Sequence, residues 1–180
     1  MEDWLRRNEH GIKMLAAAAA AAFTLIQYFG HLGEVRVEKT LGFYERFSSG
    51  SIFAARTEVL EAWESLEAQL LQLPAPATPA EMIALRRQWQ QLVVAAIKKN
   101  PNLTTDTDIM FDFFDALQVC IENDICDKKT AQELMQGAAT IFVGNNCPYV
   151  AHVRFNQKLA NYGAKAATFA GQPCQVDIYR

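Results

Sequence analysis

Four aspartates in one short stretch are the residues of this sequence best suited to bind a metal ion. They are Asp106, Asp108, Asp112 and Asp115, and helical spacing places Asp108 beside Asp112 and Asp112 beside Asp115. Carboxylates on one helix face can hold a divalent cation. Acidic residues near the start of a helix also stabilise it through the helix dipole, and no Glu-x-x-His pair accompanies these four. We therefore predict a structural role for them and no metal site.

A second polar group combines His152, Arg154 and Asn156. Such a group can contact RNA or an anion, but it is more simply interpreted as a solvated helix face. His10, His31 and His152 are too scattered for a metal cluster, and the sequence has no glycine-rich phosphate loop, Gly-x-Ser-x-Gly or His-Glu-x-x-His signature. We predict no catalytic residue, no cofactor and no enzymatic activity.

The cysteines Cys120, Cys126, Cys147 and Cys174 include no Cys-x-x-Cys pair. Cys120 and Cys126 are also too widely spaced for a usual zinc knuckle. We therefore predict reduced thiols, some of them buried as small apolar side chains. Reduced thiols favour a cytosolic location for residues 40–180.

The run from Met14 to Phe29, MLAAAAAAAFTLIQYF, is uncharged, rich in alanine and preceded by a basic N-terminus. Steps of three and four residues place polar side chains on one side of a helix and apolar ones, such as Phe23 and Ile26, on the other. An amide is expensive in hydrocarbon, so Gln27 should face water, a partner helix or a bundle interior. We predict a pore lined by Thr24, Gln27, His31, Glu34 and Glu38.

The alanine block suits close packing between copies of this helix, because small side chains let helix backbones approach. We predict that Ala16, Ala17, Ala19 and Ala20 form this packing surface in a ring of identical chains. A run of sixteen residues spans only about 24 Å, short of a hydrocarbon core of about 30 Å. A soluble oligomer seam, an interfacial anchor and an inert single-pass anchor therefore stay open. The same outline fits a signal peptide, but we expect the segment to be retained.

Length and charge limit the function classes. The chain has 180 residues, room for one domain and an appendage, and its net charge of −3 makes nucleic acid an unlikely partner. We predict a membrane or pore helix over residues 1–31 and an assembly domain over residues 32–180. Basic residues nearly balance on the two sides of the apolar run, so the thiols decide the orientation: a bacterial inner membrane with the helical domain in the cytoplasm.

Apolar periodicity predicts an all-α fold, in which a long N-terminal membrane helix continues into a bundle of about five further helices. The first helix runs from about residue 4 to 48, and Thr78 caps a third helix through a capping box. Thr105 or Asp106 begins a fourth, whose aromatic residues make it the centre of the core. Asp127 caps a fifth helix that Gly144-Asn145 ends, and Pro148 opens a sixth that continues through Phe169.

The order of these parts resembles a family. The apolar helix runs into GFYERFSSGSIFAARTEVLEAW, followed by IMFDFFDALQVCIENDICD and AHVRFNQKLANY. This plan resembles small bacterial single-pass proteins with a divergent HEPN-like helical domain, and in particular the membrane accessory proteins of type VI-B CRISPR systems. The resemblance implies a homo-oligomeric pore that supports antiviral defence by a partner RNA-guided nuclease. It makes His152, Arg154 and Asn156 a degenerate HEPN-like site, because the arginine and histidine pair of active HEPN ribonucleases is missing.

The function that we expect is a homo-oligomeric channel or permeabilising pore whose partners are its own copies and the lipid bilayer. Two alternatives stay open. One is a membrane-anchored HEPN-like protein that binds or cleaves RNA, and the other is a passive oligomeric scaffold.

Overall fold

The computed structural model describes residues 9–70 and 78–174, and within them every regular element is a helix. The first four are α2 (Glu9–Ser48), α3 (Gly50–Leu70), α4 (Pro79–Lys99) and α5 (Pro101–Glu122). Then α6 (Lys128–Ala131), the π-helical η1 (Gln132–Gln136) and α7 (Gly137–Asn156) follow one another directly, and α8 (Ala164–Ala170) comes last. The all-α prediction is confirmed.

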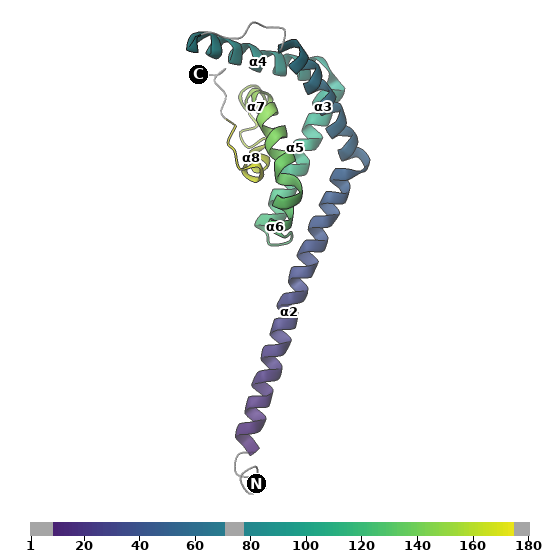
Figure 1. Ribbon diagram of the computed structural model, residues 1–180, viewed down its shortest axis with the longest axis vertical. Coiled ribbons are helices and arrows are strands. Elements are labelled where there is room, and N and C mark those ends of the chain that lie inside the picture. Colours follow the sequence, from purple (N-terminus) through teal and green to yellow (C-terminus); the bar gives the residue numbers. More distant parts are fainter. Residues whose placement is uncertain (1–8, 71–77, 175–180) are drawn as a thin grey trace.

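A single long helix dominates the outline of the molecule. Figure 1 shows α2 running past the side of a bundle formed by the other helices and extending far beyond it toward the N-terminus. The C-terminal part of α2 is attached to the bundle near α6: the Thr40 hydroxyl accepts a hydrogen bond from the backbone N–H of Asp127 at 2.8 Å. The long first helix is confirmed from Glu9 to Ser48, and its predicted start near residue 4 lies outside the described residues.

The bundle is organised around α5. Its residues Phe111, Phe114 and Leu117 are at most 1% exposed. The Phe114 ring lies 5.8 Å from that of Phe47 in α2 and 6.0 Å from that of Phe169 in α8, measured between centroids. The aromatic residues therefore join three helices that are distant in sequence, and the prediction that this helix forms the centre of the core is confirmed.

Caps at the helix starts decide two of the sequence predictions. The Thr78 hydroxyl accepts from the backbone N–H of Glu81 while the Glu81 carboxylate accepts from that of Thr78, so the predicted capping box is present. The predicted start of α5 at Thr105 or Asp106 is wrong. The helix begins four residues before Thr105, at Pro101, where a missing N–H costs nothing, and the Asn100 side chain caps it.

The segment from Asp127 to Asn156 also differs from the prediction. Asp127 caps α6 as expected. The predicted end at Gly144-Asn145 and the new start at Pro148 are wrong, because α7 continues through Pro148. Proline usually breaks a helix by removing a hydrogen bond and crowding the carbonyl four residues earlier. Here Phe142, Val143, Cys147 and Val150 are buried on both sides of the proline, so core packing keeps one helix.

The predicted last helix is interrupted as well. After Asn156 the chain turns, and α8 begins behind Gly163, whose φ of +64° suits glycine. A Cβ at Gly163 would lie 3.0 Å from the Phe111 ring, so a larger residue would push α8 away from α5. This turn folds α8 back onto the core, with the Lys165 ammonium against the Glu122 carboxylate.

Two disulfides cross-link the bundle, so the prediction of reduced thiols is wrong. Cys120 pairs with Cys126, whose Cα atoms lie 5.2 Å apart, and Cys147 pairs with Cys174 at 5.0 Å. Both separations fall in the usual range for disulfides. The tight turn after α5 returns Cys126 to the end of that helix, and the chain after α8 returns Cys174 to α7. Sequence spacing alone showed neither return, and the argument for a cytosolic bundle loses its premise.

Candidate functional site: the projecting part of α2

The part of α2 that extends beyond the bundle is the most unusual surface of the molecule. We call residues 13–31 the α2 projection; all side chains described in it are exposed. They include Phe23, Ile26 and Phe29, which are 61%, 69% and 65% exposed. Large apolar side chains gathered on one segment mark a surface that contacts another protein or a membrane. The predicted boundary between residues 31 and 32 falls inside this continuous helix, close to where the bundle begins.

The predicted polar stripe lies on one face of this helix. At 3.6 residues per turn, Thr24, Gln27 and His31 fall within about 60° of one another, while Ile26 and Phe29 lie on the other side. The stripe continues toward the bundle through Glu34 and Glu38, and all five predicted pore-lining residues are exposed. The His31 ring lies 4.0 Å from the Glu34 carboxylate, an i, i+3 pair in which the histidine is charged only when protonated.

The projection satisfies some of its polar groups internally. The Thr24 hydroxyl donates to the carbonyl of Ala20 at 2.9 Å, which leaves it no need of a partner outside the helix. Three of the four predicted packing alanines are exposed and precede Thr24 in the helix: Ala17, Ala19 and Ala20. The side chain of Ala16 lies outside the described residues. In the part of the chain that is described, none of the helices has both the length and the apolar character needed to cross a membrane.

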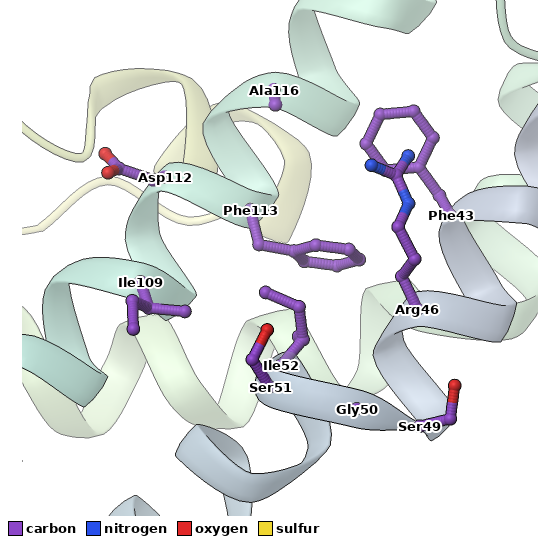
Figure 2. A pocket seen from close by; sticks show the side chains of 10 residues that line it. All are labelled: Phe43, Arg46, Ser49, Gly50, Ser51, Ile52, Ile109, Asp112, Phe113 and Ala116. Atoms are coloured by element: carbon purple, nitrogen blue, oxygen red, sulfur yellow. The ribbon is translucent and has the colours of Figure 1, made fainter.

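A groove lies where α2 meets α3. Figure 2 shows Phe113 and Ile52 at its centre, with Arg46 and Phe43 on one side and Asp112 on the other. Its volume is about 550 Å³, and the Arg46 guanidinium stands 4.4 Å from the centroid of the Phe43 ring. The carboxylate of Asp112 and the guanidinium of Arg46 do not converge on one point, so the groove offers no constellation for acid–base chemistry.

Two of the four aspartates of α5 hold neighbouring elements in place. Asp108 accepts hydrogen bonds from the hydroxyls of Tyr149 and Tyr162, and Asp115 accepts from the backbone N–H of Ala166 at the start of α8. Burial, with Asp108 beside it, raises the pKa of Tyr149 to about 12 and also raises that of Tyr162. Among the described residues no group of three potential ligands is placed to hold a metal. The dipole explanation is wrong, because α5 has no acidic residue in its first turn.

The predicted degenerate HEPN-like residues do not form a common site. His152 and Asn156 make a local pair on α7, with the Asn156 amide 2.8 Å from the histidine Nδ1. Arg154 lies on another side of the helix, where its Nε donates to the carbonyl of Tyr162 at 2.9 Å and holds the turn before α8. Burial, with Lys98 nearby, lowers the pKa of His152, which favours its neutral form.

The comparisons with known proteins found no relative of this chain. No protein-family model, no curated protein and no solved structure matches the chain. The class that the fold defines is an all-α bundle with two disulfides and a projecting amphipathic helix. The sequence predicted the two faces of the projection, but it missed the disulfides, because the spacing of the cysteines does not show that the chain returns to α5 and α7.

Proposed function

We propose that this protein is a homo-oligomer of lipid membranes in which the α2 projections of several copies pack together around a permeation path. The observation that carries the proposal is the exposure of Phe23, Ile26 and Phe29 on a helix that no other part of the described chain covers. An assembly of projections would turn Ile26 and Phe29 toward lipid and Gln27 toward the interior. Its predicted lining is the stripe of Thr24, Gln27, His31, Glu34 and Glu38.

The alanines support packing between projections. Ala17 and Ala20 lie on the same side as Thr24 and Gln27, where their small side chains let neighbouring backbones approach closely. A polar stripe surrounded by apolar residues is costly for a lone helix in hydrocarbon, and a ring removes that cost by facing the stripes to one another. The proposal thus concerns an assembly rather than a single inserted helix.

The disulfides favour an oxidising compartment for the bundle, because glutathione and thioredoxin keep cytosolic thiols reduced. We therefore propose that the bundle lies outside the cytoplasm, opposite to the expectation from reduced thiols. In a bacterium this is the periplasmic side of the inner membrane. That placement weighs against a direct contact with a cytosolic RNA-guided nuclease, so the link to CRISPR defence remains a prediction from resemblance alone.

The experiment that tests the proposal uses the full chain purified with its disulfides intact. Its mass in detergent gives the oligomeric state, and release of a dye from loaded vesicles gives the permeability. We expect a closed oligomer that releases dye, and we expect Gln27→Leu to reduce the release by tenfold or more. The matched control is Gln88→Leu, the same change at an exposed glutamine of α4. A monomer in both detergent and lipid, or unchanged release by Gln27→Leu, would refute the proposal.

A further inference from the structure

A second cavity, separate from the groove of Figure 2, lies between α3 and α7, and Met110 of α5 also lines it. Its volume is about 270 Å³. Its inner walls are the side chains of Val59, Met110 and Phe142, of which 2%, 1% and 8% are exposed. Leu60 and Ile141 stand at its mouth and are 43% and 61% exposed. The cavity therefore opens from the protein surface into the apolar core.

The volume and the lining of this cavity limit which molecules can enter it. Ligand sites usually enclose about 300–1,000 Å³, and this one lies just below that range. A partner helix with its side chains is about 10–12 Å across, too wide for such a space. The walls are mostly apolar, so a polar segment would leave most of its backbone groups unsatisfied. A slender hydrocarbon chain meets both conditions.

One cation stands among the lining residues. The guanidinium of Arg56 lies 4.8 Å from the centroid of the Phe47 ring and 6.0 Å from that of Phe53, so two aromatic rings hold it in place. None of the ion pairs found among the described residues involves Arg56. The Asn145 amide lines the same cavity from α7. A guanidinium fixed beside an apolar cavity suits a carboxylate, which it can bind through two parallel hydrogen bonds.

We propose that this cavity binds a long-chain fatty acid, with the hydrocarbon tail between Val59, Met110 and Phe142 and the carboxylate on Arg56. Charge complementarity selects the acid over a neutral lipid, and the small volume of the apolar interior selects a single chain. The proposal is independent of the assembly of the α2 projections, because none of the lining residues belongs to residues 13–31.

The test is photolabelling of the full, oxidised chain with a diazirine analogue of palmitic acid, followed by mapping of the labelled peptides. We expect label on α3 near Val59 and on α7 near Phe142, and competition by excess palmitate but not by hexadecanol. Arg56→Gln should reduce labelling about tenfold, since a charge-assisted hydrogen bond is lost, and Arg56→Lys should restore part of it. Equal competition by hexadecanol, or full labelling of Arg56→Gln, would overturn the assignment of the carboxylate.

Filling the cavity tests the tail. Ala138→Trp should abolish labelling, whereas Ala68→Trp, the same change at an exposed position of α3, should not. Because Ala138→Trp can disturb folding, Leu60→Trp serves as a second variant that blocks the mouth without entering the core. If Leu60→Trp is labelled like the wild type, or if the label falls on the α2 projection instead, the site is refuted. Neither outcome depends on whether the protein oligomerises or releases dye.

Discussion

Along α2, residues 35–47 and residues 13–31 belong to one continuous helix but have opposite surroundings. In the first segment Thr40 is fully buried and Phe47 is 3% exposed, packed against α5 and hydrogen-bonded to the start of α6. In the second, even Ile26 is 69% exposed. Most helical stability in proteins comes from packing rather than from propensity. The comparison teaches that the bundle carries its own stabilising contacts, whereas the described side chains of the projection gain no such packing from the rest of the described chain.

The largest expected effect separates the two regions directly. Phe114→Ala removes a ring that is completely buried between three helices, and we expect it to destabilise the bundle by about 3–5 kcal/mol. Phe23→Ala, the same change on the projection, should alter bundle stability by less than about 0.5 kcal/mol. Urea unfolding followed by the fluorescence of Trp63 and Trp89 measures both. A loss of similar size for Phe23→Ala would show that the projection packs on the bundle.

Removing the disulfides should weaken the bundle next. Replacing Cys147 and Cys174 by serine removes a disulfide between residues 27 positions apart in sequence. From loop-closure entropy we expect the free energy of unfolding to fall by about 3.5 kcal/mol. The pair Cys120 and Cys126, which closes only a six-position link, should contribute about 2 kcal/mol. Urea unfolding of the two double-serine variants gives the order. If loss of the Cys120–Cys126 disulfide lowers the free energy of unfolding more, then contacts of the turn after α5, rather than chain entropy, dominate the contribution of that disulfide.

The attachment of α2 to the bundle gives a smaller effect. Thr40→Val removes a buried hydroxyl that accepts from the Asp127 backbone at 2.8 Å and donates to the Arg36 carbonyl, and we expect a loss of about 1–3 kcal/mol. Thr24→Val is the matched control, because that hydroxyl bonds only to its own helix. Calorimetric melting compares the two variants. Equal melting temperatures would contradict the role given to Thr40.

The smallest effects concern pH within the bundle. The Thr130 backbone N–H lowers the pKa of Asp127, so its stabilising contribution is present above the unfolded pKa of about 3.9 and is lost as pH falls. Burial raises the pKa of Asp115, so its contribution is largest at low pH and declines as pH rises through the folded value. Urea unfolding of Asp127→Asn and Asp115→Asn between pH 3 and 7 should therefore differ from the wild type with opposite pH trends. Parallel trends would contradict these directions.

Local patterns predicted the elements whose determinants are neighbours in sequence. The capping box at Thr78, the Asp127 cap and the aromatic density of α5 all have partners within a few residues or on one helix face, which is why they were found. The start of α5 was missed although Asn100 and Pro101 carried the signal, because the same residues also end α4: Asn100 is the C-cap of one helix and the N-cap of the next. Pro148 was misread because a buried environment outweighs its local preference.

The sequence by itself determined the helical class and the two faces of the α2 projection, because both depend only on the period of the helix. Tertiary structure alone decided that Cys120 meets Cys126 and Cys147 meets Cys174, that Asp115 accepts a hydrogen bond from α8, and that Arg56 lies beside an apolar cavity. The physical reason is that these pairings depend on how turns return one helix to another. Such returns are set by the packing of the whole core and leave little trace in any single stretch of residues.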